Sequence, residues 1–195
     1  MVAAPRTRVT IDEYLAMEQA SPEKHTLWDG EVYATAGARP DHNAVTANVL
    51  AELRSVTRRG PCRAFSSDLK VYAPRRKGFV SADASLVCGP LALHGDTRDV
   101  ITNPMVLVEV LSESTEAFDR GEKAAGYRGI ATLRDSIFVS LLERHVEHRA
   151  RQPDGSWLLR ERRDDEMPIA TLDGALRLAE PYLKVFDASG LDDSA

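Results

Sequence analysis

The segment of residues 104–112, PMVLVEVLS, constrains the fold more than any other part of the chain. Its apolar residues occupy both odd and even positions, a pattern typical of a β-strand that is covered on both faces. Together with the mixture of helices and strands expected along the chain, this strand predicts an α/β or α+β fold with helices on both faces of a sheet. Glu109 lies inside this apolar run. Because burying an unpaired carboxylate costs several kcal/mol, Glu109 should be protonated, ion-paired or bound to a cation, unless it lies at an exposed strand end.

A second carboxylate, Asp83, occurs in comparable surroundings, in the segment FVSADASLVC. Aspartate is uncommon inside strands, so it usually marks a bulge, a strand end or a functional site. If the two strands are neighbours, Asp83 and Glu109 can converge on one Mg²⁺ ion through their oxygen atoms. Asp68, in SSDLKVY, could supply a further oxygen ligand or, more simply, cap a turn.

Lys123 lies in the helix that is expected to follow the Glu109 strand, and Asp119 precedes it by four residues. An exposed i,i+4 ion pair accounts for both residues. The functional alternative is that two carboxylates and one lysine suit the metal-assisted hydrolysis of a phosphodiester. Asp83, Glu109 and Lys123 are therefore the candidate catalytic residues, and the two acids are also the candidate metal ligands.

Helix caps, turn residues and apolar periodicity predict a mixture of helices and strands along the rest of the chain. Thr10 and Glu13 form a capping box for a helix through about Gln19, and Asp29-Gly30 predicts a hairpin turn. Further helices are expected at 41–59 and 114–130, strands at 62–74, 78–89, 103–112 and 135–142, and a last hairpin turn at 152–155. Without a repeat or an evident linker, residues 1–195 should form a single domain with loose ends at about 1–8 and 189–195.

The charge balance limits how this chain could bind nucleic acid. Thirty acidic against 25 basic residues give a net charge of -5, which argues against binding through bulk electrostatics. Two groups of basic residues in turns could contact phosphates locally, although ordinary solvated loop charges explain each group as well. These groups are Arg58, Arg59 and Arg63, and Arg75, Arg76 and Lys77.

The cysteines and the apolar runs bear on the cellular compartment. No run approaches the roughly 20 apolar residues that cross a bilayer, and the first residues lack the apolar stretch of a signal peptide. We therefore expect a cytoplasmic protein without a membrane span. Cys62 and Cys88 are too far apart in sequence for a zinc knuckle or a CxxC pair, and two reduced, buried thiols are the expectation, although the sequence does not exclude their meeting in space.

Several strings together resemble the PD-(D/E)XK nuclease superfamily and, within it, the Uma-type family of restriction endonucleases. They extend from about Thr10 to Phe186 and comprise TIDEYLAME, SPEKHTLWDGEVYATAG, the pair His42-Asn43, SSDLKVY, NPMVLVEVLSESTEAFDRGEKAAGYRGI and RQPDGSW. The resemblance implies a restriction-endonuclease-like core, which is a mixed sheet flanked by helices. It also implies a protein that is often dimeric and that holds Mg²⁺ or Mn²⁺ between acids at strand ends.

The resemblance also assigns roles to single residues. Asp83 matches the aspartate of the motif and Glu109 its second acid, and both would ligate the metal. Leu111 occupies the usual lysine position, and Lys123 in the next helix matches the lysine of this family. Two accessory residues also match. They are Tyr127, for which packing is the simplest role, and His42, which would contact phosphate or cap the long helix.

Two departures from the family pattern leave two functional hypotheses. Ala82 replaces a proline, and Thr26 replaces a glutamate for which Glu23 or Glu31 could compensate.

The leading hypothesis is a metal-dependent endonuclease that acts on nucleic acid, with DNA as the expected substrate and a homodimer as the expected assembly. The alternative is a catalytically impaired nuclease fold that serves as a nucleic-acid-binding or regulatory module. A different α/β enzyme has little support, because the chain contains no GxGxxG, Walker, GxSxG or HExxH string.

Overall fold

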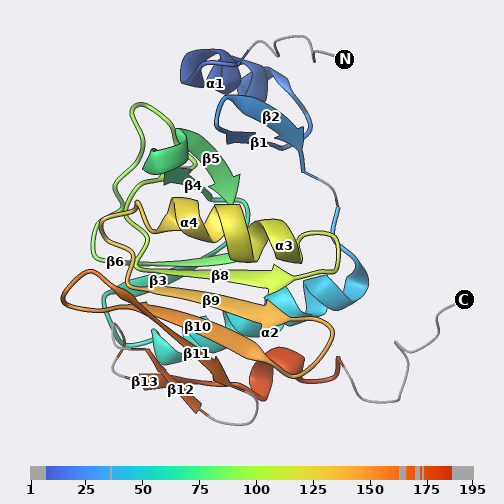
Figure 1. Cartoon of the computed structure of the whole chain (residues 1–195), viewed down its shortest axis with the longest axis vertical. Coiled ribbons are helices and arrows are strands. Elements are labelled where there is room, and N and C mark those ends of the chain that lie inside the picture. The colour runs from blue at the N-terminus through green and yellow to red at the C-terminus, as the bar shows by residue number, and fades with distance from the viewer. Residues whose placement is uncertain (1–7, 36, 163–165, 170–171, 173, 186–195) are drawn as a thin grey trace, which may run out of the picture.

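A six-stranded and a five-stranded sheet organise the chain in the computed structural model, which describes residues 8–35, 37–162, 166–169, 172 and 174–185 (Figure 1). The six-stranded sheet has the order β11-β10-β9-β8-β6-β3, and the five-stranded sheet has the order β2-β1-β5-β4-β7. Both are mixed sheets, so the predicted α+β class is confirmed. Apart from Arg8, the expected loose ends at 1–8 and 189–195 lie outside the described residues.

The N-terminal elements follow the predicted caps and turns. Helix α1 (Ile11–Ala20) begins with the predicted capping box, in which the Glu13 amide donates to the Thr10 hydroxyl at 3.2 Å and the Glu13 carboxylate accepts from the Thr10 amide at 2.8 Å. Strands β1 (His25–Trp28) and β2 (Glu31–Ala34) form the predicted hairpin. Its turn residues Asp29 and Gly30 both adopt positive φ, as a two-residue hairpin turn requires.

Two segments that were predicted as single strands are each divided between the two sheets. Residues 62–74 form β3 (Cys62–Ser66) and β4 (Lys70–Ala73), and residues 78–89 form β5 (Gly78–Ser81) and β6 (Ala84–Cys88). β3 and β6 join the six-stranded sheet, whereas β4 and β5 join the other. The breaks fall at Asp68 and Asp83, because aspartate competes for the backbone hydrogen bonds that a strand needs.

The strand that carries Glu109 lies inside the six-stranded sheet, as its apolar pattern predicted. β8 (Val106–Leu111) runs between β6 and β9 (Asp135–Ser140), and all six of its residues are buried. β10 (Val146–Arg151) and β11 (Trp157–Arg162) form the predicted last hairpin. The remaining short elements are β7 (Val100–Ile101), β12 (Glu166–Ile169), β13 (Gly174–Arg177) and 3₁₀ turns at Pro74–Arg76 and Glu180–Tyr182.

Helices cover both faces of the six-stranded sheet (Figure 1). Helix α2 (Pro40–Val56) packs Val45, Val49 and Leu53 against one face and ends three residues before the predicted boundary. On the other face a continuous helical segment connects the parallel strands β8 and β9. It consists of α3 (Glu116–Phe118), a π-helical turn (Asp119–Lys123) and α4 (Ala124–Tyr127). Among the described residues, no helix combines the length and the apolar character that crossing a bilayer requires.

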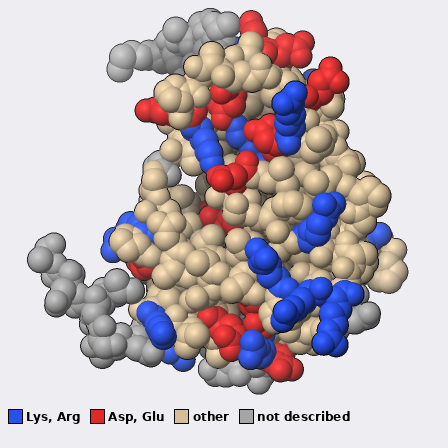
Figure 2. Space-filling model, turned by 180° about the vertical axis from the view of Figure 1, so that it is seen from behind, with Lys and Arg blue, Asp and Glu red and all other residues tan. Residues whose placement is uncertain are grey.

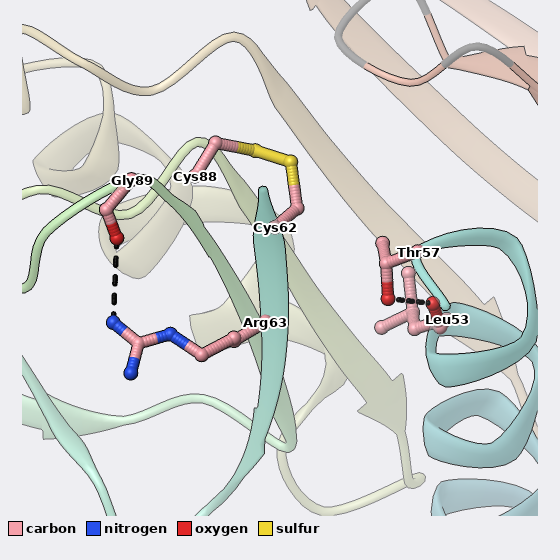
Figure 3. The surroundings of a disulfide bond; sticks show 6 residues. All are labelled: Leu53, Thr57, Cys62, Arg63, Cys88 and Gly89. Atoms are coloured by element: carbon pink, nitrogen blue, oxygen red, sulfur yellow. Dashed lines mark hydrogen bonds between the residues drawn. A yellow bond between two sulfur atoms is a disulfide. The ribbon is translucent and has the colours of Figure 1, made fainter. Parts of the chain in front are cut away.

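The prediction of two reduced thiols is wrong in this structure, which joins Cys62 and Cys88 in a disulfide (Figure 3). Cys62 begins β3 and Cys88 ends β6, and the antiparallel register places them directly opposite each other. The pairing was hidden from the sequence because it depends on which strands become neighbours, and 26 positions separate the two residues. The bond connects the edge strand β3 to the interior of the sheet.

Candidate active site

Asp83 lies where the chain leaves the five-stranded sheet and enters the six-stranded one. Ala84 pairs with Val108 in the antiparallel β6–β8 ladder, so Asp83 faces the position of Glu109 on the neighbouring strand. Asp83 directly precedes this ladder, and its negative charge acts on the pKa of Glu109. The Val110 amide donates a 2.7 Å hydrogen bond to Asp83 Oδ2, which fixes the carboxylate beside β8.

Glu109 is buried, and its partners come from the helical segment that follows its own strand. Lys123 Nζ donates a 2.8 Å hydrogen bond to Glu109 Oε2, and the Tyr127 hydroxyl donates to Glu109 Oε1. Lys123 Nζ also lies 3.2 Å from Asp119 Oδ1. The predicted Asp119–Lys123 ion pair therefore exists, but it is buried rather than on the surface, because both side chains point toward the sheet.

Burial and nearby charges change the pKa of Glu109 and of Lys123. Burial raises the pKa of Glu109 to about 8, and the neighbouring carboxylates of Asp119 and Asp83 contribute to the rise even though Lys123 opposes it. Burial also disfavours the charged form of Lys123, but the surrounding carboxylates outweigh burial and keep the pKa of its ammonium above the ordinary value. We call Asp83, Glu109, Asp119 and Lys123 the acid cluster. It has three carboxyl groups for one ammonium group, and a cation bound beside them would favour the ionised form of Glu109.

His42 lies beside the acid cluster and does not cap helix α2. The helix begins at Pro40, and Arg39 occupies the position before it, so His42 lies within the first turn. Its Nε2 atom is 3.5 Å from Asp83 Oδ2. The hydrogen bond with Asp83 outweighs burial and raises the pKa of the His42 ring. The capping alternative for His42 is therefore wrong, and its position beside Asp83 is compatible with contact to a phosphate.

The structure does not bring Asp68 into the acid cluster. Asp68 lies in the turn between β3 and β4, and its carboxylate is exposed and pairs with Lys24, so it does not join the buried contacts of Glu109 and Lys123. Thr26 lies in β1 opposite Tyr33, and the Glu31 carboxylate accepts a 2.7 Å hydrogen bond from the Tyr33 hydroxyl. The third carboxylate of the cluster is supplied by Asp119.

The basic residues that were predicted as backbone contacts separate into paired and unpaired side chains. Arg76 donates a 2.8 Å hydrogen bond to Asp29 and lies 3.9 Å from the carboxylate of Glu122, so its charge is engaged within the fold. Arg63 donates to the carbonyl oxygen of Gly89 at 3.3 Å. The other four side chains are exposed. They are Arg58 and Arg59 after helix α2, and Arg75 and Lys77 beside Arg76.

Asp119 is the member of the cluster that was not assigned a functional role from the sequence. The i,i+4 spacing of Asp119 and Lys123 was the signal in the sequence that the two side chains are close, but the same spacing also occurs in exposed helical ion pairs. A further feature of the segment is the π-helical turn Asp119–Lys123, a conformation that is rare and frequently found at functional sites.

The donor set of the acid cluster fits a hard divalent cation. A carboxylate has about four lone-pair sites, so the hydrogen bonds to Asp83 and Glu109 leave acceptor capacity on both groups. Among the described residues, no three His, Cys, Asp or Glu side chains are arranged to hold a metal ion by themselves. Mg²⁺ commonly binds through only one or two carboxylates and completes its shell with water and substrate phosphates. The cluster suits that mode of binding.

Comparisons with known proteins identify the family of the chain. A family model described as "Uma2: Putative restriction endonuclease" matches residues 11–179. The chain belongs to the Uma2 family. The match includes all four residues of the acid cluster, together with His42 and Tyr127, so the site lies within the part of the chain that is characteristic of Uma2 proteins.

Individual proteins resemble the chain over most of its length. The chain is 32% identical over 157 residues to the uncharacterized protein slr1290 of Synechocystis sp., covering 80% of this chain and 82% of the relative. It is 29% identical over 161 residues to sll1609 of the same organism, covering 83% and 91%. A crystal structure from Anabaena variabilis, described as "a putative nuclease belonging to DUF820", has a TM-score of 0.70 at 15% identity and covers 91% of this chain and 99% of that one. This similarity establishes the shared nuclease-like fold.

Proposed function

We propose that this Uma2 protein is a metal-dependent endonuclease that hydrolyses phosphodiester bonds in nucleic acid, with DNA as its substrate. One observation carries the proposal: Asp83 and Glu109 meet at the junction of β6 and β8, with the Lys123 ammonium group bonded to Glu109. Two acids and a lysine supply the groups that hydrolysis of a phosphodiester needs. The description of the family as restriction endonucleases supports DNA as the substrate.

Asp83 and Glu109 would hold one Mg²⁺ or Mn²⁺ ion through their carboxylate oxygens. When bound, the ion would act as a Lewis acid toward the phosphate and lower the pKa of a coordinated water. The chain fixes both carboxylates in advance, because the Val110 amide holds Asp83 and the Tyr127 hydroxyl holds Glu109. Pre-organised groups need little rearrangement when charge develops on the phosphate.

Lys123 would stabilise the negative charge that accumulates on the phosphate during hydrolysis. Its ammonium group is charged, because the carboxylates of Glu109, Asp119 and Asp83 outweigh burial and raise its pKa above the ordinary value. Asp119 positions this group, since it pairs with Lys123 from one helical turn away. His42, whose Nε2 atom lies 3.5 Å from Asp83 Oδ2, would donate a hydrogen bond to a phosphate oxygen.

Nicking of supercoiled plasmid DNA tests the proposal. The wild type should relax the plasmid in Mg²⁺ or Mn²⁺ and not in a chelator, and Asp83→Asn and Glu109→Gln should each lower the rate by at least tenfold. Asp68→Asn is the matched control, because it removes an exposed carboxylate outside the cluster. A wild type without activity in either metal, or equal activity of all four proteins, would overturn the proposal.

The expected homodimer also remains part of the proposal. The resemblance to restriction endonucleases supports it, since these enzymes commonly act as symmetric pairs. Light scattering at several protein concentrations measures the mass of the particle directly. A mass of twice the 21.5 kDa chain is the expected result, and a single chain at all concentrations would contradict it.

A further inference from the structure

Three exposed arginines form a patch at the C-terminal end of helix α2. We call Arg54, Arg58 and Arg59 the α2 arginine patch; the first lies in the last helical turn and the other two directly follow the helix. Within the part of the chain that the structure describes, none of the three side chains forms an ion pair or hydrogen bond. In Figure 2, Lys and Arg side chains gather at the lower right, where this end of α2 lies after the turn from the view of Figure 1. The patch is thus free to bind an anionic partner.

Helix α2 connects this patch to the acid cluster. His42, in its first turn, lies 3.5 Å from Asp83, and Arg58 follows His42 by 16 positions in the sequence. At a rise of 1.5 Å per residue, the helix extends about 21 Å from His42 to its last residue, Val56, and Arg58 lies just beyond that end. The exposed positions between them carry small or uncharged side chains, so they leave room for an extended partner. These positions are Asn43, Ala47, Ala51 and Ser55.

We propose that the α2 arginine patch binds the phosphate backbone of a nucleic-acid duplex whose scissile phosphate lies at the acid cluster. This inference rests on the proposed nuclease function. Arginine suits the task because its planar guanidinium group donates two hydrogen bonds to a phosphate and remains charged. Since base pairs are stacked 3.4 Å apart, about 21 Å corresponds to roughly six base pairs between the cut and the bound phosphates. The surface positions the duplex and does not read its sequence.

The segment that carries Arg58 and Arg59 is held in place from several sides (Figure 3). The Thr57 hydroxyl donates a 2.7 Å hydrogen bond to the Leu53 carbonyl oxygen, which fixes the end of the helix. On the other side of the turn, the disulfide joins Cys62 to Cys88, and the Gly89 amide donates to the Pro61 carbonyl oxygen at 3.0 Å. A fixed segment loses little conformational entropy when it binds, which favours affinity.

Basic residues at a helix C-terminus also have a purely structural explanation. The carbonyl end of a helix carries a partial negative charge, and nearby arginines stabilise it by typically 0.3–1 kcal/mol. That role and the proposed one make different predictions. A structural role lowers the melting temperature when the arginines are removed and leaves nucleic-acid binding unchanged, whereas a binding role changes the affinity and its dependence on salt.

Equilibrium binding in a chelator tests the inference without cleavage. The probes are labelled 30-base-pair duplexes of one sequence, as DNA and as RNA, titrated with wild type, with Arg58→Ala/Arg59→Ala and with Arg98→Ala/Arg160→Ala. The last variant is the matched control, because it removes two exposed arginines elsewhere on the molecule. The patch variant should bind at least tenfold more weakly in low salt, and its slope of log Kd against log salt should fall by about 1.8 relative to wild type.

The outcomes separate this inference from the proposed nuclease function. If the patch variant loses affinity and the control does not, the patch binds the duplex in question, whether DNA or RNA. This result supports the inference even if no preparation cleaves DNA. Equal affinities and equal salt slopes in the patch variant and wild type would overturn the proposal that the patch binds nucleic acid, even if plasmid cleavage is intact. A patch variant with a lower melting temperature and an unchanged salt slope would also overturn the proposal and favour the structural explanation.

Discussion

The ammonium group of Lys123 lies 2.8 Å from the carboxylate of Glu109, and both side chains are buried between β8 and the helical segment that follows it. The two residues are 14 positions apart and belong to different elements. Their contact connects the helix to the centre of the six-stranded sheet. The same contact provides the only ammonium group among the described residues of the acid cluster.

Replacing Lys123 should destabilise the fold as well as remove activity. Lys123→Met leaves the buried carboxylate of Asp119 without its cation and removes the hydrogen bond to Glu109, which together typically cost about 3–5 kcal/mol. Chemical denaturation should show a loss within this range, and adding Glu109→Gln to the variant should restore part of it. Additive losses in the double variant would contradict the proposed coupling between Lys123 and Glu109.

Gly126 should be intolerant of a larger side chain. A Cβ atom at this position would collide with the ring of Trp28, which is itself buried, so helix α4 could not keep its place over β8. Gly126→Ala should therefore lower the free energy of unfolding by about 1–3 kcal/mol. Gly121→Ala is the matched control in the same helical segment, since a Cβ atom there meets no neighbour within 4 Å. Equal stabilities of the two variants would refute the close approach of Trp28 to α4.

Glu18 should contribute to the pH dependence of stability. Burial acts to raise the pKa of Glu18, but hydrogen bonds from Lys70 and His25 outweigh it, so the pKa in the folded state lies below the ordinary value of 4.5. A carboxyl group with a lowered pKa stabilises the fold above about pH 4.5 and loses that contribution as the pH falls through the folded-state value. Glu18→Gln should thus be less stable than wild type by about 2 kcal/mol at pH 7, and the difference should shrink in acid. Glu23→Gln, which removes an exposed carboxylate, is the matched control variant.

The disulfide should stabilise the sheet measurably. It closes a loop of 26 residues, for which the chain-entropy estimate is about 3.5 kcal/mol. Excess dithiothreitol should lower the melting temperature of wild type, because its two thiols reduce the bond to two cysteines and form a cyclic disulfide. Cys62→Ala/Cys88→Ala should melt at a lower temperature than oxidised wild type and not respond to dithiothreitol. A wild type whose melting temperature is insensitive to the reductant would contradict the pairing.

Much of the fold could be predicted because its signals are local. The capping box at Thr10, the Asp29-Gly30 turn and the apolar pattern of β8 each act within a few residues, and the structure confirms all three. The division of residues 62–74 and 78–89 between two sheets could not be predicted. It depends on which strands pair, and the polar residues at the break points are also compatible with a bulge in a single strand.

In the candidate site, too, local features could be predicted from the sequence, whereas contacts between distant segments could not. Asp83 and Glu109 can be recognised in the sequence because carboxylates are costly inside apolar strands. The register of β6 and β8 brings the two residues together. The contact of His42 with Asp83 required knowing how α2 packs on the sheet. Asp119 was interpreted as a surface partner of Lys123, since the sequence specifies their spacing but not that this side of the helix is buried.

The affinity for Mn²⁺, measured by isothermal titration calorimetry, tests most directly whether the acid cluster is a metal-dependent catalytic site. Wild type and the exposed control Asp68→Asn should bind the ion equally, and Asp83→Asn and Glu109→Gln should each bind it at least tenfold more weakly. Equal affinity in all four proteins, or no binding by wild type, would contradict the account and favour a nuclease fold that no longer performs hydrolysis.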